Sequence, residues 1–223
     1  MKNRNLYIAI LLTFIFNATV LSAQVISDAK GRPLKQIEYF ELDGSPFFLK
    51  TWVKGDVIFD NGKIIKNVEL KYDQVKDALI FLSNENEELY FIDPIKEFNL
   101  NDGAINYLFR NGFAPYKDFS SDTYFEILLQ GKIMLLKKVI KTIVETKEYN
   151  SATTIKKIIN NLNLYIVKDN KIIATSKESI KIIANAIDPQ KSSSLIEFSE
   201  LNKLNPRKEE DLKKILKYYN SMP

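Results

Sequence analysis

Histidine and cysteine are both absent from this sequence of 223 residues. Without them the chain can form neither a Ser-His-Asp nor a Cys-His nucleophile system, and it has no imidazole base and no zinc ligand of either kind. Disulfides are excluded, and we expect no lipid anchor of the type that is attached to a cysteine. The catalytic groups that remain are carboxylates, lysines, tyrosines and serines.

Glycine is also scarce, and the two signs of charge are nearly balanced. With seven glycines in all, the chain has little capacity to build a glycine-rich phosphate-binding loop. The 32 basic and 28 acidic residues leave a net charge of +4, and the abundance of Lys, Asn and Ile is typical of an AT-rich genome. We therefore predict no nucleic-acid partner.

The N-terminus has the order of a secretory signal peptide. Lys2 and Arg4 precede an apolar run over residues 6–16, and Ala23 is a suitable cleavage position. The run covers about a dozen residues, fewer than the roughly 20 that a membrane-spanning helix needs. We predict a signal peptide over residues 1–23, cleavage near Ala23, a periplasmic or secreted protein, and no transmembrane span in the mature chain. A buried N-terminal helix is the alternative.

The mature chain changes from β patterning to helical patterning along its length. We expect a partly extended segment over residues 24–46, a mainly antiparallel β region over residues 47–175, and a helical region over residues 176–223 that packs on the sheet as one unit. Asp60-Asn61-Gly62 is the clearest turn, because Asn-Gly supplies the positive φ angles of a tight hairpin. Four hairpins are predicted, with strands at residues 54–59 and 63–72, 78–82 and 88–92, 124–129 and 132–137, and 164–167 and 172–175.

The secondary structure predicted for two further segments depends on how the spacing of their apolar residues is interpreted. Residues 139–146 fit either a strand or one face of a helix, and their β-branched density favours the strand. Residues 154–162 carry apolar side chains at helical spacing, which predicts a short helix. These apolar residues are Ile155, Ile158, Ile159 and Leu162.

Local capping signals predict where the C-terminal helices begin. Thr175 with Glu178 has the spacing of a capping box, and Ser194 with Glu197 repeats it. Asn205-Pro206 predicts the start of the last helix. The predicted fold is therefore α+β, with an antiparallel β meander of sandwich-like or open-barrel-like form followed by C-terminal helices.

Several short stretches resemble a family of exported Bacteroidetes proteins for which no activity is established. They are Leu21-Ser22-Ala23-Gln24, residues 52–57, Asp60-Asn61-Gly62-Lys63, Lys71-Tyr72-Asp73, and the tail from Glu209 to Asn220. The similarity covers most of the mature chain and rests on turn and core patterns. It implies an exported protein and an architecture, and it implies no catalytic residue.

Aromatic side chains are dense in the β region and form the first candidate binding surface. Ring faces bind sugars and extended peptides, but aromatic residues are also the usual filling of antiparallel sheets. Turn residues lie between the rings over residues 109–119, as in a binding loop or in a structural loop held by its own aromatics. The candidate surface residues are Trp52, Phe109, Phe113, Tyr116 and Phe119.

Charged residues are weaker candidates for a catalytic or binding site. Paired carboxylates could support glycoside cleavage, although exposed turns are also rich in Asp. The paired lysines Lys137-Lys138 and Lys213-Lys214 could contact anionic lipid, and a solvated face is the favoured interpretation. The carboxylates concerned are Asp43, Asp56, Asp60, Asp73 and Asp77.

These observations favour a non-catalytic periplasmic or cell-envelope binding or structural module. A carboxylate-dependent hydrolase that acts on envelope glycan is the alternative. We predict no cofactor and no metal site, and an envelope protein, peptide or glycan as the class of partner. The binding module requires an apolar patch or an unpaired strand edge, whereas the hydrolase requires two carboxylates that converge in a cleft.

Overall fold

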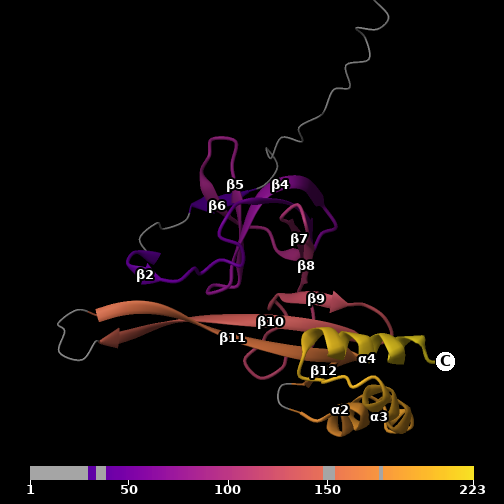
Figure 1. The fold of residues 1–223 in the computed structure, drawn as a ribbon. Helices are drawn as coiled ribbons and strands as arrows, with labels where there is room; N and C mark the ends of the chain where they lie inside the picture. Colours follow the sequence, from indigo (N-terminus) through magenta and orange to yellow (C-terminus); the bar gives the residue numbers. More distant parts are fainter. Residues whose placement is uncertain (1–29, 34–38, 148–153, 176–177) are drawn as a thin grey trace, which may run out of the picture.

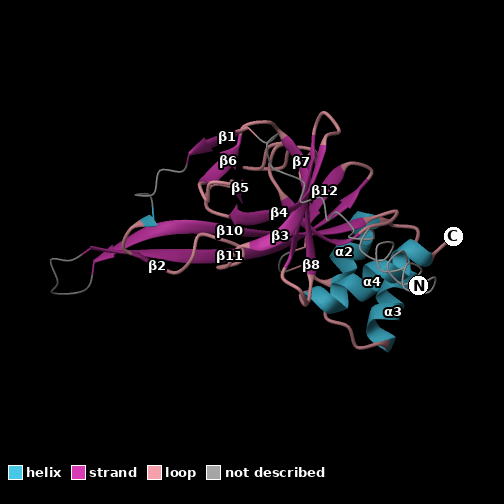
Figure 2. Cartoon of the chain, turned by 90° about the horizontal axis from the view of Figure 1, so that it is seen from above, coloured by secondary structure: helices cyan, strands magenta, loops and turns pink. Residues whose placement is uncertain are grey.

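A computed structural model describes residues 30–33, 39–147, 154–175 and 178–223. They form one mostly antiparallel sheet followed by helices (Figures 1 and 2), in the strand order β1-β6-β5-β4-β3-β7-β8-β9-β10-β11-β12, with β2 beside β11. The predicted α+β fold is confirmed, and the sheet is not closed into a barrel. The strands are β1 (Gly31–Pro33), β2 (Leu42–Asp43), β3 (Val53–Phe59), β4 (Ile64–Asp73), β5 (Ala78–Leu82), β6 (Glu88–Phe91), β7 (Ile95–Asn101), β8 (Asn106–Arg110), β9 (Phe125–Leu129), β10 (Met134–Lys147), β11 (Thr154–Lys168) and β12 (Lys171–Ala174); the helices are α2 (Ile180–Ile187), α3 (Ser192–Leu201) and α4 (Glu209–Ser221).

Local turn chemistry explains the four predicted hairpins, and all four are confirmed. Between β3 and β4, Gly62 adopts a φ of +82°, and the Phe59 N–H donates to the carbonyl of Lys63 at 2.9 Å. Between β11 and β12, Asp169 and Asn170 have φ angles of 49° and 59°. Two consecutive positive φ angles match the type I′ turn, whose twist suits a two-residue hairpin.

The first half of the sheet encloses an aromatic core. Tyr72 and Phe98 are 1% exposed, and their rings meet edge to face with centroids 5.2 Å apart. Phe109 stacks on Phe98 at 5.0 Å. These side chains alternate along β4, β7 and β8 with outward-facing residues, which is the period that buries one face of a strand.

The helices cover one face of the part of the sheet that is formed by β9, β10, β11 and β12 (Figure 1). Leu135 of β10 and Ile166 of β11 pack in one cluster with Ile183 of α2 and Ile215 of α4. Asn220 of α4 bonds both backbone groups of Ile133, accepting from its N–H at 2.9 Å and donating to its carbonyl at 3.1 Å. The helical region is therefore packed on the sheet through a continuous core.

The opposite face of the same strands is buried by the loop between β8 and β9. Phe113 of this loop packs with Phe125, Leu136 and Tyr165. The base of the β10–β11 hairpin is therefore buried on both faces, which holds it rigidly in the body of the molecule.

The helix predicted over residues 154–162 is wrong, because this segment is the first part of β11. β11 pairs with β10 in continuous register, from Lys147 opposite Thr154 to Met134 opposite Val167. The strand prediction for residues 139–146 is confirmed in the same ladder. Helical spacing and strand alternation both accommodate a few apolar residues, and the long-range pairing partner decides between them.

The predicted helix starts are displaced by a few residues. Ser179 is the N-cap of α2 and accepts from the N–H of Ile182, whereas the Thr175 hydroxyl donates to the carbonyl of Leu164. α3 begins two residues before Ser194. Asn205 forms a turn that precedes α4, in which its side chain accepts from the N–H of Arg207.

Candidate binding surface on the hairpin arm

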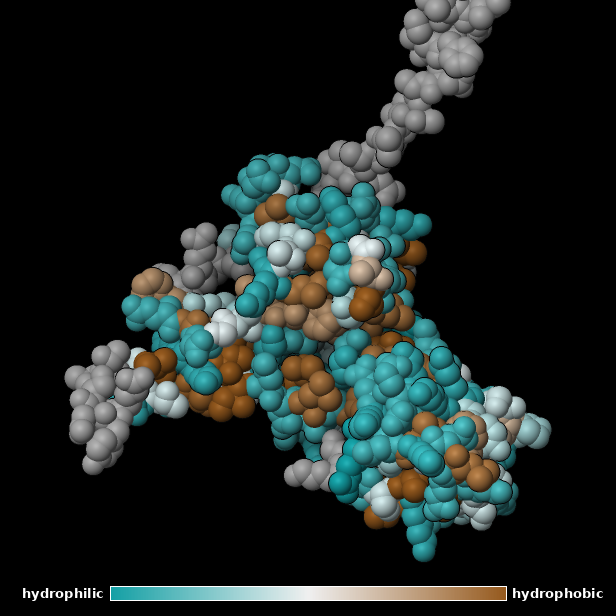
Figure 3. Space-filling view, viewed as in Figure 1, coloured by the Kyte–Doolittle hydropathy of each residue, from teal (hydrophilic) through white to brown (hydrophobic). Residues whose placement is uncertain are grey.

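The outer part of the β10–β11 hairpin projects from the body as an arm, which we define as residues 139–147 and 154–162 (Figures 1 and 2). At roughly 3.3 Å a residue, nine residues of strand extend about 30 Å. Hydrophobic residues gather over the arm in Figure 3. The arm is therefore long enough to present a surface of its own.

β2 pairs with the edge of β11 that faces away from β10, and the residues that follow it, 44–47, cover one face of the arm. β2 lies parallel to β11, with Leu42 opposite Lys156. The neighbouring Gly44 approaches Ile158 so closely that an added Cβ would lie 3.1 Å from the Ile158 side chain. The ammonium of Lys141 donates to the carbonyls of Ser45 and Phe47 at 2.9 and 2.5 Å. These contacts fix the position of the arm.

The other face is exposed, and we call it the uncovered face. Opposing residues of an antiparallel pair lie on the same face, so the register determines which residues form the uncovered face. Ile159 is 51% exposed, and none of its members belongs to a hydrophobic core of the described residues. It consists of Ile140, Thr142, Val144 and Thr146 from β10, opposite Asn161, Ile159, Lys157 and Ile155 from β11.

The outer edge of β10 is the second feature of the arm, and we call it the free edge. β9 pairs with β10 only at residues 135–137. From Lys138 to Lys147, no described residue pairs with the backbone on the side away from β11. An edge of this kind presents a row of N–H and C=O groups to an incoming strand. The free edge contains no proline, which would remove a backbone donor from such a ladder.

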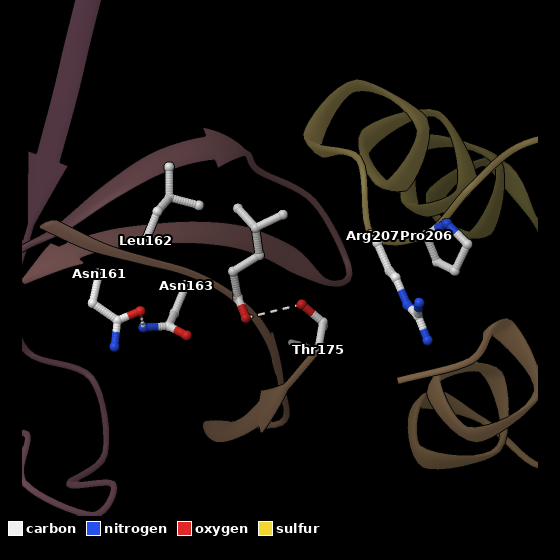
Figure 4. A pocket seen from close by; sticks show the side chains of 7 residues that line it. Asn161, Leu162, Asn163, Thr175, Pro206 and Arg207 are labelled. Carbon is white, nitrogen blue, oxygen red and sulfur yellow. Dashed lines mark hydrogen bonds between the residues drawn. The ribbon is translucent and has the colours of Figure 1, made fainter. Parts of the chain in front are cut away.

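A pocket of about 510 Å³ lies at the root of the arm (Figure 4). It is lined by Leu162, which is 55% exposed, and by hydrogen-bonding side chains of β11 and of the turn before α4. Asn163 donates to the side chain of Asn161 at 3.3 Å, and Arg207 lies on the other side of the pocket, in the turn before α4 (Figure 4). The pocket therefore combines apolar side chains with hydrogen-bonding ones.

The aromatic residues predicted from the sequence as a surface lie mainly in the core. Phe109 is 2% exposed and Phe113 is 8% exposed. Phe119 packs edge to face on Phe125 and Tyr165, and Tyr116 also packs on Tyr165. The segment is a structural loop held by its own rings, which was the alternative interpretation of the same residues.

Trp52 is half-buried, as Tyr116 and Phe119 are, but it lies outside this loop, just before β3. The ammonium of Lys71 lies 4.5 Å from its ring centroid. A cation–π contact of this kind orients the ring against the sheet. The same ammonium lies 4.9 Å from the ring centroid of Phe47, so Trp52 is close to the segment that binds Lys141 of the arm.

The clustered aspartates are hydrogen-bonded within the fold. Asp73 is fully buried and accepts from the hydroxyl of Tyr39 at 2.5 Å and from the N–H groups of Val75 and Lys76. Asp56 accepts from the N–H of Asn67 at 2.9 Å. Asp43 lies in β2 and Asp60 in the β3–β4 turn. The structure brings only Asp73 and Asp77 to the same end of β4, at the β4–β5 turn.

Asp77 pairs with Lys138, so the prediction of a solvated lysine pair is wrong for this residue. Lys138 is 5% exposed, and its ammonium donates to Asp77 at 2.7 Å, to the carbonyl of Tyr124 at 2.8 Å and to the hydroxyl of Tyr72 at 3.2 Å. Burial lowers the pKa of Lys138, and the nearby charge of Asp77 opposes that shift. All three donors of the ammonium are used inside the protein.

The neighbouring Lys137 is also tied into the fold. It forms ion pairs with Glu126 at 3.0 Å and with Glu209 of α4 at 3.3 Å. Burial raises the pKa of Glu126, and the charge of Lys137 opposes that shift. This pair of lysines therefore connects β10 to three other elements and is not available to a lipid surface.

No helix of the described residues is long and apolar enough to cross a membrane. Within the same residues there is no group of three or more acidic, histidine or cysteine side chains that could hold a metal ion. The predicted signal peptide lies outside the described residues. Comparison with protein-family models, with curated proteins and with solved structures finds no match.

Proposed function

We propose that this chain is an exported, non-catalytic binding module of the cell envelope, which receives an extended segment of a partner protein along the free edge of β10. The free edge, beside an exposed apolar face, is the observation that carries the proposal. In strand addition of this kind, main-chain hydrogen bonds supply affinity, and the side chains of the flanking face supply specificity.

The way the arm is held supports this role. Its base is buried on both faces, and Lys141 attaches its middle to the backbone of residues 45–47. A strand that is already extended and fixed loses little conformational entropy when a second strand joins it. The free edge is therefore preorganised for pairing.

The environment of the carboxylates also favours a non-catalytic role. Asp73 is buried with three donors, and Asp77 is neutralised by Lys138. A glycoside hydrolase needs one carboxyl group to act as an acid and a second to act as a base or nucleophile toward a substrate in a cleft. Asp73 and Asp77 would first have to lose their internal hydrogen bonds before either could act on a substrate.

Site-specific photocrosslinking in the native host tests the proposal. A photoreactive amino acid is placed at Thr142 or Ile159 on the uncovered face, and at the exposed Glu200 of α3 as the control. We expect adducts of defined mass from the two arm positions and none from the control. We also expect Val144→Lys, which places a charge on the same face, to reduce the adducts strongly.

Two outcomes would contradict the proposed function. One is the absence of adducts from both arm positions in intact cells. The other is the release of fragments from purified envelope glycan by the wild-type protein, unchanged in Val144→Lys and abolished in Asp77→Asn. That second pattern would favour the hydrolase instead.

A further inference from the structure

We infer that the strand received by the free edge is β10 of a second copy of this chain, so that two arms join into a four-stranded antiparallel sheet. This inference rests on the proposed function, since it names the partner of the same edge. It follows from symmetry and from the order of charges along the free edge, which together select one register.

Symmetry restricts the ways in which two identical edges can pair. Two antiparallel copies of one strand are related by a two-fold axis perpendicular to the sheet. Each residue is then opposite one that lies equally far from the axis on the other strand, and the two uncovered faces lie on the same side. Ile143 is the midpoint of residues 139–147, so an axis at Ile143 uses the whole outer length of β10.

The axis at Ile143 also matches the charges. It places Lys141 of each copy opposite Glu145 of the other, which gives two opposite-charge pairs. Two of the three donors of the Lys141 ammonium stay on the carbonyls of Ser45 and Phe47, and the third is left for Glu145. An axis at Val144 places Lys141 opposite Lys147, and an axis at Thr142 places both Lys141 and Glu145 opposite apolar residues. Opposite charges across strands stabilise a pair, and like charges destabilise it. The axis at Ile143 is therefore the favoured register.

The same register gives compatible neighbours on the uncovered face. Ile140 is opposite Thr146, and Thr142 is opposite Val144, so each cross-strand pair consists of two β-branched side chains. β-branched residues pack well on a pleated surface. The two central strands then present one continuous row of β-branched side chains on this face.

The shape of the molecule permits this arrangement. Apart from β2, which lies beside it, the arm extends away from the rest of the described chain in both views (Figures 1 and 2). Because the two arms would run antiparallel, the two bodies would lie at opposite ends of the joined sheet. Glu145 is exposed and, among the described residues, forms no ion pair with Lys156, its cross-strand neighbour in β11, so its carboxylate is available to a second copy.

The test is the oligomeric state of the protein, expressed in full and purified in the form that the host produces. Analytical ultracentrifugation over a range of concentrations is expected to give a reversible dimer. Glu145→Lys places lysine opposite lysine at two symmetric positions, and we expect it to weaken the dimer about tenfold or more. Glu200→Lys makes the same charge change on α3 and should leave the dimer unaffected.

A charge exchange makes the test specific to the register. Lys141→Glu with Glu145→Lys restores two opposite-charge pairs, so the double variant should dimerise more tightly than Glu145→Lys alone. Circular dichroism of each variant verifies that it is folded, which matters for Lys141 because of its bonds to Ser45 and Phe47.

The inference is overturned if the wild-type protein is monomeric at every concentration, or if Glu145→Lys leaves the dimer unchanged. The crosslinking experiment distinguishes a failure of the dimer inference from a failure of the proposed strand-binding function. Adducts with twice the mass of the chain support the second copy. Adducts of a different mass from the same positions overturn the inference and leave the strand-binding role in place.

Discussion

Replacing Lys138 by methionine tests the buried ion pair that joins the two halves of the sheet. Methionine is also long and unbranched, but it lacks the ammonium group. The carboxylate of Asp77 and the carbonyl of Tyr124 would each lose a donor within 2.8 Å. Asp77 would retain the hydroxyl of Tyr72 and the N–H of Tyr124. The variant therefore leaves the carboxylate with two of its three donors and without the positive charge.

The expected loss of stability follows from the exposure of the two partners. Removing one member of a buried ion pair costs about 3–5 kcal/mol. The side chain of Asp77 is 29% exposed, so water can solvate part of its charge, and we expect a loss of about 2–3 kcal/mol in the free energy of unfolding. Asp77→Asn added to Lys138→Met removes the unpaired charge and should cost less than the sum of the two single changes.

A surface ion pair supplies the matched control. Lys54 and Glu69 lie 3.6 Å apart with side chains 55% and 42% exposed, so Lys54→Met should change the free energy of unfolding by less than about 1 kcal/mol. Urea denaturation can be followed by circular dichroism and by the fluorescence of Trp52, the only tryptophan. The reasoning is refuted if Lys138→Met costs no more than Lys54→Met, or if the double variant costs the full sum.

Two further predictions concern buried polar groups. Burial raises the pKa of Tyr90 to about 12 and that of Tyr72 well above its usual 10, so stability should be complete below pH 10 and decline as the pH rises toward 12 and beyond. The part of the tyrosinate absorbance that is lost in Tyr72→Phe or Tyr90→Phe should appear together with unfolding, and its appearance at pH 10 in the folded protein would contradict this. Asn220→Ala removes both bonds to the Ile133 backbone and should cost about 2 kcal/mol, or about 4–8 °C in Tm. The exposed Asn202→Ala is its control, and equal melting temperatures would contradict the assigned role.

The turns could be predicted from the sequence because their geometry is set by a few adjacent residues. Gly62 and the pair Asp169-Asn170 tolerate positive φ angles that most residues avoid, whatever the rest of the chain does. β11 could not be predicted in the same way. Its first half satisfies the spacing of a helix, and only the partner strand β10 selects the extended form.

The candidate site was harder to predict than the fold, because its residues contact partners that are distant in the sequence. Lys138 pairs with Asp77, 61 residues away in the sequence, and beside Lys137 it has the appearance of a solvated charge. The aromatic residues of the β8–β9 loop have the composition of a binding surface, and they are core because β9, β10 and β11 come together around them. The local sequence contains no signal of either contact.

The sequence alone determined which chemistries the chain lacks, where its tightest turns lie, and that strands precede helices. Each of these follows from residue type or from the spacing of near neighbours. Only the tertiary structure decided which carboxylates are occupied, which aromatics are buried, and that β10 has a free edge beside an uncovered apolar face. A strand edge is free only when no other segment pairs with it, and pairing is a property of the whole sheet.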